Sequence, residues 1–487
     1  MKIGIFGGSF NPVHVEHVRL AVAAIKELSL DKLIVVPTFI TPNKTVATVS
    51  PDDRFNMLKI AFDGEKKVEI SDFEIKSGGT SYTYLTVEHF KKEYPNDELY
   101  FFVGGDMLKD FKTWKNPKRI LAAANLAVFS REGDDADFVS EKDYFEKNFS
   151  SRFIKLSAVG KKISSTEARV YLSLGLIPEG IPEKVIEYIK NNKVYRESEY
   201  ADFLKRNLTE SRLIHTANVA ACALKKTKEL SLDEGKVFTA AILHDCAKYL
   251  KVDDFKGFTM PEGVPSPVVH QYLGAFVAEN VLDVKDDEVI DAIRFHTSGK
   301  ANMTTLGKLI FTADMIEKGR SYEGVETLRS LYEKDFDECF KTCLKEEVIH
   351  LKNKTTDIYG ETLAAYDYYV KGENMESSKF AEEICKILKD HKAEDVVSLC
   401  VKGKTDVADY YVIASGRSMT HTRSLIDKVE EETEKLGFSP IRSEGVREGR
   451  WAVLDFGDVI VHVFNDETRV LYHLENLWGD EKNTVKY

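Results

Sequence analysis

A short apolar run that ends in glycines and leads to two histidines constrains the N-terminal part of this chain most strongly. Ile3-Gly4-Ile5-Phe6 predicts the first strand of a sheet, and Gly7-Gly8-Ser9-Phe10 follows it directly. Glycine at a strand end lets the backbone approach a ligand closely, and Pro12 suits the start of a helix. His14 and His17 then share one face of that helix near its positively polarised N-terminus. Because such a place attracts phosphate, the run predicts a site where imidazoles stabilise phosphoryl transfer.

A second polar cluster supports this interpretation. Ile163-Ser164-Ser165-Thr166-Glu167-Ala168-Arg169 follows the strand-like run Phe153-Ile154-Lys155-Leu156. Ser164 and Glu167 have the spacing of a helix capping box, which explains the hydroxyls but not Arg169. Hydroxyls, backbone N–H groups and Arg169 together would hold a triphosphate tail. A plain strand-turn-helix unit with two incidental histidines would not account for this second cluster.

With both clusters in view, residues 1 to about 190 resemble the nucleotidyltransferase superfamily that carries an H-x-x-H signature and, within it, the bacterial nicotinate-nucleotide adenylyltransferases. Ser81-Tyr82-Thr83 matches that family's nicotinate-site segment, and Trp114 falls where the family places an aromatic ring against the pyridine. The chain departs from the family at Leu85, where an acidic residue is usual, and at Asn43-Lys44, where a His-Lys pair is usual. Gly104, Gly105 and Asp106 follow a strand-like run. Phe129, Ser130 and Arg131 end another such run and match a family position near the nucleotide.

This resemblance implies a Rossmann-like parallel α/β sheet and the transfer of an adenylyl group from ATP to nicotinate mononucleotide. His14, His17, Lys44 and Arg169 would neutralise the developing charge, with Mg²⁺ bound mainly by the ATP phosphates. Enzymes that make coenzyme A precursors or CDP-alcohols are rivals within the class, and both the 81–83 segment and Trp114 argue against them. By the same resemblance, the substrate-binding residues are Gly7, Gly8, Ser9, Phe10, Ser81, Tyr82, Thr83, Gly104, Asp106, Trp114, Arg131, Ile163, Ser164, Ser165 and Thr166.

The composition of the whole chain limits the possible architectures and partners. A length of 487 residues predicts two to four domains, and polar punctuation divides the chain into segments 1–194, 196–372 and 376–487. The net charge of −12 argues against a general nucleic-acid binder, so no direct DNA binding is expected. No apolar run is long enough to span a membrane, and no signal peptide precedes the first strand. Six scattered cysteines without C-x-x-C spacing complete the case for a cytoplasmic protein.

Segment 196–372 has a helical pattern throughout and carries a set of potential metal ligands. His215, His244-Asp245, His296 and Asp314 each lie on or beside a predicted helix. A single histidine on an apolar helix face is more often a core residue than a ligand. Imidazoles and carboxylates from several helices, however, are the donors that a divalent first-row metal prefers. The segment therefore predicts an all-α domain with a metal site.

The order and spacing of these residues resemble the HD superfamily of metal-dependent phosphohydrolases. Lys248 and the run Ala313-Asp314-Met315-Ile316-Glu317-Lys318-Gly319-Arg320 point to a branch similar to bacterial hydrolases that cleave diadenosine tetraphosphate, a dinucleoside polyphosphate, symmetrically into two ADP. That branch implies iron, or manganese, as the metal, and catalytic roles for Asp245 and Lys248. A deoxynucleoside or guanosine polyphosphate is the alternative substrate. The resemblance implies His215, His244, Asp245 and Asp314 as ligands of a first ion, His270 and His296 as ligands of a second ion or phosphate contacts, and Lys248 and Arg320 as phosphate contacts.

Segment 376–487 predicts a small α/β sheet without visible chemistry. Strand patterns occur near residues 395–401, 410–416, 451–456 and 459–464, and a long charged helix runs from about Thr420 to Leu436. Gly457-Asp458 predicts a tight hairpin turn between the last two strands. The titratable residues that could suggest an active site have no metal spacing, nucleophile motif or phosphate loop to organise them. They are Asp406, Asp409, Glu444 and His462, the last of which is predicted to lie in an alternating strand.

The same segment resembles the ribosomal silencing factor family (Iojap-like). Matching motifs are Tyr410-Tyr411-Val412-Ile413-Ala414-Ser415-Gly416, Gly449-Arg450-Trp451 and Arg469-Val470-Leu471-Tyr472-His473-Leu474-Glu475. The resemblance implies binding to a protein of the large ribosomal subunit, which blocks subunit joining. From residue 376 onward, 22 Asp and Glu outnumber 16 Lys and Arg, which suits a basic partner protein better than rRNA. The aromatic and acidic C-terminal end is the predicted contact surface.

The whole chain is therefore expected to be a fusion of two enzymes and one binding module. A translation regulator whose upstream domains only sense nucleotides is the alternative. The intact His14 and His17 pair and the intact His-Asp set weigh against that alternative, because a sensor needs binding but not catalytic groups.

Overall fold

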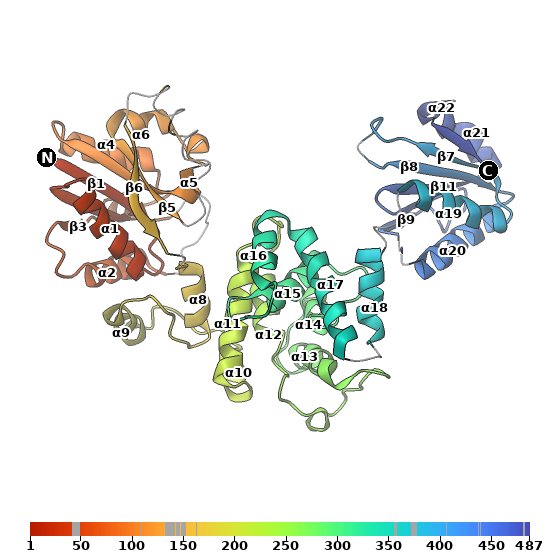
Figure 1. Cartoon of the computed structure of the whole chain (residues 1–487), viewed down its shortest axis with the longest axis horizontal. Coiled ribbons are helices and arrows are strands. Elements are labelled where there is room, and N and C mark those ends of the chain that lie inside the picture. The colour runs from red at the N-terminus through yellow and green to blue at the C-terminus, as the bar shows by residue number, and fades with distance from the viewer. Residues whose placement is uncertain are drawn as a thin grey trace. The chain divides into compact units, whose positions relative to one another are not determined.

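The computed structural model of the chain describes residues 1–40, 49–108, 110–131, 142, 147, 152–161, 163–354, 358–371, 377–405, 407–436, 438, 440–480 and 483–487, apart from the side chains at 106, 131, 371 and 466. The chain forms two compact units, Met1–Leu224 and Lys225–Tyr487. Figure 1 colours their elements along the chain. Among the described helices, none is long and apolar enough to cross a membrane.

A six-stranded parallel sheet forms the centre of the first unit. Its strands are β1 (Lys2–Gly8), β2 (Lys32–Pro37), β3 (Val68–Ile70), β4 (Glu98–Gly104), β5 (Asn125–Arg131) and β6 (Phe153–Gly160). They lie in the order β3-β2-β1-β4-β5-β6, and every neighbouring pair is parallel. Parallel strands need crossover connections, so helices cover both faces and the strands are apolar on both sides. The predicted Rossmann-like parallel sheet is confirmed.

The helices of the first unit are α1 (Val15–Glu27), α2 (Pro51–Ala61), α3 (Phe73–Ser77), α4 (Thr83–Glu93), α5 (Gly105–Leu108), α6 (Pro117–Ala123), α8 (Ser165–Ser173), α9 (Glu183–Asn192), α10 (Ala201–Asn207) and α11 (Glu210–Leu224), with a 3-10 turn at Phe111–Thr113. Helices α1, α2 and α9 pack into one hydrophobic core with Phe6 of β1. Helices α4 and α6 pack into a second core with Ile3 and Ile5, on the opposite face of the sheet.

The first helix begins later than the sequence predicts. Pro12 lies in a turn, after a cis peptide bond from Asn11, and α1 begins at Val15. His14 is extended and caps this helix, so the expectation that Pro12 opens the helix is wrong. The side-chain caps that His14 and His17 supply fix the helix start at this point.

The second unit begins with a helical region, as the sequence predicts. No strand lies in the described residues between 225 and 371. Short 3-10 turns cover Val252–Asp254 and Ser266–Val268, and a π-helical turn covers Asp367–Lys371. The helices are α12 (Glu234–Leu243), α13 (Val269–Asn280), α14 (Asp287–Arg294), α15 (Thr305–Ile316), α16 (Val325–Lys334), α17 (Phe336–Lys354) and α18 (Gly360–Tyr366).

A mixed six-stranded sheet with helices follows. Its elements are α19 (Ser377–Asp390), β7 (Glu394–Cys400), β8 (Tyr410–Gly416), α20 (Met419–Lys435), β9 (Arg442–Glu444), β10 (Trp451–Asp455), β11 (Val459–Asn465), α21 (Asp466–Tyr472), α22 (Leu474–Trp478) and β12 (Thr484–Lys486). The order is β12-β7-β8-β11-β10-β9. Among the described pairs, β8 and β11 are parallel and the others antiparallel. The predicted hairpin between β10 and β11 is confirmed, with Gly457 at a φ of +84°.

Both faces of this second sheet are covered. Helices α19 and α20 pack on one face. Leu474 and Trp478 of α22 pack against the other. As a result β11 is buried along six of its seven residues, and the prediction that His462 lies in an alternating strand is wrong.

Candidate functional sites

His14 and His17 form a reciprocal cap at the start of α1. The Nδ1 of His17 accepts the backbone N–H of His14 at 3.2 Å, and the Nδ1 of His14 accepts that of His17 at 3.4 Å. Their rings stack with centroids 3.5 Å apart. Because both Nδ1 atoms are acceptors, each neutral ring carries its proton on Nε2. The local fold therefore makes Nε2 the donor atom of both imidazoles, at the positively polarised end of a helix.

The second predicted cluster meets the first one in space. Ser165 Oγ donates to the carbonyl of Pro12 at 3.1 Å, and Arg169 Nη1 donates to the carbonyl of Asn11 at 2.9 Å. Thr166 lies beside the same guanidinium, its Oγ1 3.1 Å from Arg169 Nη2. The structure thus brings the N-terminus of α8 against residues 9–12, which we call turn 9–12.

Ser164 and Ile163, the two residues before α8, contact residues close to the helix start. Ser164 Oγ accepts the Glu167 N–H at 3.5 Å, which confirms the predicted helix cap. Ile163 packs against Gly180, where an added Cβ would lie 2.7 Å from its side chain. Gly180 also accepts the backbone N–H of Val15 at 2.8 Å, so this contact lies beside the start of α1.

Arg54 is a site residue that the sequence analysis did not find. It is only 3% exposed, and its guanidinium donates to the carbonyls of Ser9 (2.9 Å) and Phe39 (3.0 Å). Burial lowers the pKa of Arg54. The available signal was its position on α2, where Arg54 shares a helix face with the apolar Met57 and Leu58. A charged residue on an apolar face indicates a buried partner set.

Tyr195 was also missed, and it lies just beyond the predicted first segment. Its hydroxyl donates to Asn11 Oδ1 at 2.5 Å, and burial raises the pKa of Tyr195. Asn11 therefore accepts a hydrogen bond from Arg169 at its backbone carbonyl and one from Tyr195 at its side chain. Turn 9–12 is held by side chains from three distant parts of the sequence.

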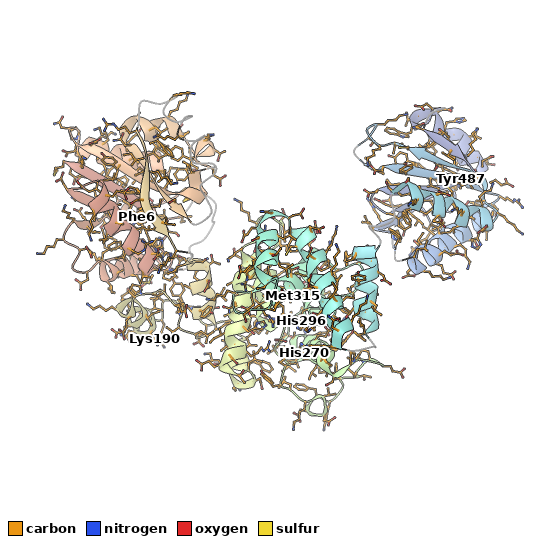
Figure 2. The ribbon with its side chains drawn as sticks, viewed as in Figure 1. Phe6, Lys190, His270, His296, Met315 and Tyr487 are labelled. Atoms are coloured by element: carbon orange, nitrogen blue, oxygen red, sulfur yellow. The ribbon has the colours of Figure 1, made fainter. Side chains whose placement is uncertain are left out.

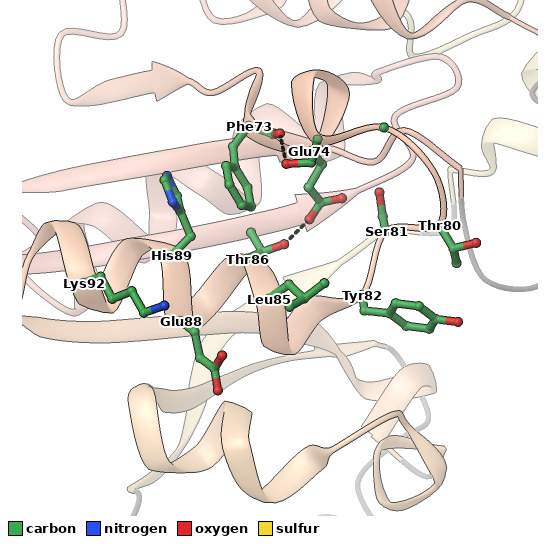
Figure 3. Close-up of a pocket in the computed structure, with 12 residues that line it drawn as sticks. Phe73, Glu74, Thr80, Ser81, Tyr82, Leu85, Thr86, Glu88, His89 and Lys92 are labelled. Carbon is green, nitrogen blue, oxygen red and sulfur yellow. Dashed lines mark hydrogen bonds between the residues drawn. The ribbon is translucent and has the colours of Figure 1, made fainter.

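The predicted mononucleotide residues fall into two places. Ser81 and Tyr82 line a surface groove of about 410 Å³ between α3 and α4, which Figure 3 shows in close-up. At its base Thr86 Oγ1 donates to Glu74 at 2.5 Å, and burial raises the pKa of this carboxyl. Trp114 is not among the groove's lining residues; it is half-buried against Phe111, with ring centroids 5.0 Å apart.

The remaining predicted residues of this site lie at strand ends, at the start of α4 or in turn 9–12, or fall outside the described residues. Thr83 is the first residue of α4, and Gly104 is the last residue of β4. Gly7 and Gly8 end β1, and Phe10 packs its ring edge-on against His17 with centroids 5.0 Å apart. Lys44 lies outside the described residues, as do the side chains of Asp106 and Arg131.

The second unit contains a buried cluster of the predicted metal ligands. His244, Asp245 and His296 place one ligand atom each within 4.8 Å of one another. The Nδ1 of His244 lies 2.6 Å from the carbonyl of Ala241, and that of His296 lies 2.8 Å from the carbonyl of Ile293. Hydrogen bonds from Nδ1–H fix the tautomer that has its lone pair on Nε2, as metal-ligating histidines require. The donor set suits a divalent first-row metal.

His270 lies between Lys248, a predicted phosphate contact, and this cluster. Figure 2 labels His270 beside His296. Its Nε2 lies 3.0 Å from Lys248 Nζ, 3.1 Å from Asp245 Oδ1 and 3.3 Å from His296 Nε2. Burial lowers the pKa of His270. Burial opposes ionisation of Asp245 too, but the neighbouring histidines hold its pKa well below the usual range.

Asp314 and Arg320 form an ion pair at the end of α15. Arg320 Nη2 donates to Asp314 Oδ1 at 2.5 Å, and Nε donates to the Asp314 carbonyl at 2.8 Å. Arg320 is thus engaged in orienting a predicted ligand, whereas its predicted contact with phosphate stays a prediction. His215 is largely buried on α11 of the first unit and stays a predicted ligand as well.

The titratable residues of the last segment occupy separate surroundings. Trp451 Nε1 donates to Nδ1 of the buried His462 at 3.3 Å, and burial lowers the pKa of His462 to about 4. Asp409 accepts Lys402 at 3.0 Å, and Glu444 is exposed on the edge strand β9. Asp406 lies outside the described residues.

Comparisons with known proteins match three parts of the chain to three families. The model of the cytidylyltransferase-like family matches residues 5–170. A probable nicotinate-nucleotide adenylyltransferase of Clostridium tetani is 41% identical over 198 residues, which cover 40% of this chain and 99% of that protein. A probable nicotinate-nucleotide adenylyltransferase/Ap4A hydrolase of Mycoplasma genitalium is 32% identical over 66% of this chain and 89% of its own length. The chain belongs to the nicotinate-nucleotide adenylyltransferase family.

This adenylyltransferase family member carries two further domains. The model of the HD domain matches residues 212–319, and that of the ribosomal silencing factor during starvation matches residues 374–486. A crystal structure of a predicted HD superfamily hydrolase involved in NAD metabolism from Clostridium acetobutylicum is 27% identical, with a TM-score of 0.32, over 35% of this chain and 94% of that one. The predicted fusion of three families is confirmed.

Proposed function

We propose that residues 1–194 transfer an adenylyl group from ATP to nicotinate mononucleotide. A phosphate oxygen of the mononucleotide bonds to the α-phosphorus of ATP, the bond from that phosphorus to the bridging oxygen breaks, and pyrophosphate leaves with Mg²⁺. The observation that carries the proposal is the meeting of the His14 and His17 pair with the N-terminus of α8 at turn 9–12. The two relatives named for this activity support it.

The residues would act by position and charge. The Nε2–H groups of His14 and His17 donate to phosphate oxygens as charge develops, and Arg169 and Lys44 neutralise the leaving pyrophosphate. The backbone of residues 7–10 and 163–166 cradles the phosphates. On the mononucleotide side, the 81–83 segment and Trp114 hold the nicotinate ring, and Asp106 and Arg131 hold the nucleotide.

For residues 196–372 we infer hydrolysis of diadenosine tetraphosphate, in which one water splits the central phosphate bridge to give two ADP. The buried His244, Asp245 and His296 cluster supports a metal site, and relatives named as Ap4A hydrolases support the substrate. His215, His244, Asp245 and Asp314 would hold iron or manganese. When bound, such an ion supplies Lewis-acid stabilisation of phosphoryl charge. Lys248 and His270 would contact phosphate oxygens, and His296 would complete the donor set.

For residues 376–487 we infer binding to a protein of the large ribosomal subunit, with translation repressed as the result. The match to the silencing factor family over residues 374–486 supports this inference. The acidic surplus of the segment suits a basic partner.

One purified full-length chain can test the two enzymatic proposals against each other. His17→Ala should reduce nicotinate adenine dinucleotide formation by about 10²-fold or more, since it removes one aimed donor, and should leave diadenosine tetraphosphate cleavage intact. Asp245→Ala should do the reverse and also lower the metal content. Each variant is the control for the other. Wild-type adenylyltransferase activity in His17→Ala, or an unchanged metal content in Asp245→Ala, would contradict the corresponding assignment.

A further inference from the structure

Helix α8 contacts different partners on its two faces. Ser165 and Arg169 are four residues apart, so they share one face, and both donate to backbone carbonyls of turn 9–12. Tyr171 is two residues beyond Arg169, which places it about 200° around the helix. Its hydroxyl donates to Asn218 Oδ1 of α11 at 2.6 Å. Helix α8, which holds turn 9–12, is therefore hydrogen-bonded on its other side to α11.

The bond between Tyr171 and Asn218 is buried, since the two residues are 6% and 5% exposed. A buried amide oxygen that lost this donor would have no water to replace it, so the contact fixes how α11 is rotated against α8. Asn218 lies one helical turn after His215, a predicted metal ligand of the HD domain. The rotation that Tyr171 fixes is thus also the rotation that sets the direction of His215.

The segment that joins α9 to α10 ties the same elements together. Tyr195 donates to the side chain of Asn11 in turn 9–12, and the backbone N–H of Ser198 donates to the carbonyl of Ser173 at the end of α8 at 2.7 Å. Turn 9–12, α8 and the connection toward α11 form one continuous hydrogen-bonded system within the first unit.

We propose that Tyr171 and Asn218 are a positioning pair that couples the adenylyltransferase site to the helix of His215. The proposal rests on the proposed ATP site. A phosphate tail at the N-terminus of α8 satisfies backbone N–H groups and favours the helical state of this nine-residue helix, which is too short to be stable alone. A more stable α8 holds Asn218, and with it α11, more firmly. ATP binding therefore orders the element that presents His215.

Hydrogen–deuterium exchange of the full chain, with and without MgATP, tests the coupling. In the wild type, MgATP should slow amide exchange in peptides from α11 by about fivefold or more, the lower end of usual coupling between sites. Tyr171→Phe removes only the hydroxyl and should reduce this effect to less than twofold, while residues 7–17 stay protected. Tyr188→Phe is the matched control. It removes a hydroxyl bonded to Asn56 and Asp53 in the same unit, and should keep the wild-type response.

The outcomes separate the coupling from the ATP site itself. MgATP binding measured by calorimetry comes first, and a full chain that does not bind MgATP would overturn the proposed function. Binding with protection of residues 7–17 but not of α11 would overturn the coupling and leave the proposed function standing. Equal protection of α11 in wild type and Tyr171→Phe would overturn the role of the pair. Protection of α11 that survives in His17→Ala, where calorimetry shows this site empty, would place the ATP effect elsewhere and overturn the proposal.

Discussion

Arg54 bridges two loops that the sequence separates by about thirty residues, Ser9 at turn 9–12 and Phe39 at the end of β2. Lysine at this position would keep the charge, but its single ammonium group cannot reproduce the planar fork that reaches both carbonyls. One of these two carbonyls would lose its charged donor, a loss of about 1.5–3 kcal/mol. We expect Arg54→Lys to lower kcat/KM for ATP by about tenfold, measured by steady-state formation of nicotinate adenine dinucleotide.

Lys59 provides the control on the same helix, because it is exposed on α2. Lys59→Gln should leave kcat/KM within about twofold of the wild type. If Arg54→Lys retained the wild-type kcat/KM, the position of turn 9–12 would not depend on the guanidinium, and the assignment of Arg54 to the site would be wrong.

Single residues also show which part of the site is readable from sequence. The spacing of His14 and His17 is local, so the sequence was sufficient to place both imidazoles at a helix N-terminus. Their tautomers depend on which backbone N–H groups reach Nδ1, and that follows from the exact start of α1. The helix face of Arg54 indicates that it is buried, but its partners and those of Tyr195 could not be assigned in advance, because they lie far away along the chain.

At the scale of an element, β11 is a buried strand with a histidine inside it. Folding holds the pKa of His462 at about 4, below the ordinary value of 6.5, because burial disfavours the charged ring. Between pH 6.5 and 4 the unfolded state therefore binds a proton that the folded state does not. The free energy of unfolding must fall as the pH falls through this window, by about 2 kcal/mol at pH 5.

Urea unfolding of the full chain at pH 7 and pH 5 measures this effect. Trp114→Phe leaves the two tryptophans of the C-terminal segment, so fluorescence then reports that segment. The urea midpoint should be lower at pH 5, and His462→Gln in the same background should lose most of that difference while still accepting from Trp451. A pH dependence that is equal with histidine and with glutamine would refute the role of His462.

The same strand shows why periodicity alone misjudged the burial. Val459-Ile460-Val461-His462-Val463-Phe464 has the length and β-branched composition of a strand, and its location was predicted within one residue. Whether its second face is covered depends on α22, which follows it and brings Leu474 and Trp478 onto the sheet. A six-residue run that is apolar apart from His462 has no periodicity from which that covering could be derived.

For the whole molecule, the first compact unit extends through α11 to Leu224. The HD match begins at residue 212, so α11 belongs by sequence to the HD domain and by packing to the first unit. The run of polar residues at 191–193 indicates a connection between two segments, but it carries no information about the contact between Tyr171 and Asn218. The predicted boundaries 1–194, 196–372 and 376–487 stay predictions for this reason.

The last segment presents an apolar surface suited to a protein partner. Leu471 and Leu477 are 74% and 69% exposed, on α21 and α22 respectively. Arg469 fixes these two helices to each other and to the sheet, because it donates to Glu475 at 2.7 Å and to Ser415 at 3.0 Å. The predicted aromatic contact surface is therefore in part aliphatic, since Trp478 turns inward against Tyr411.

We expect the full chain to co-sediment with isolated large ribosomal subunits and Leu471→Glu to weaken that binding by about tenfold or more. A glutamate there would replace an exposed apolar anchor and add charge to a face that already carries an acidic surplus. Val485→Glu on β12, where the side chain is 54% exposed, introduces the same charge outside α21 and α22 and should bind as the wild type does. Equal weakening by both variants would point to net charge alone, and no retention of the wild type would count against a ribosomal partner.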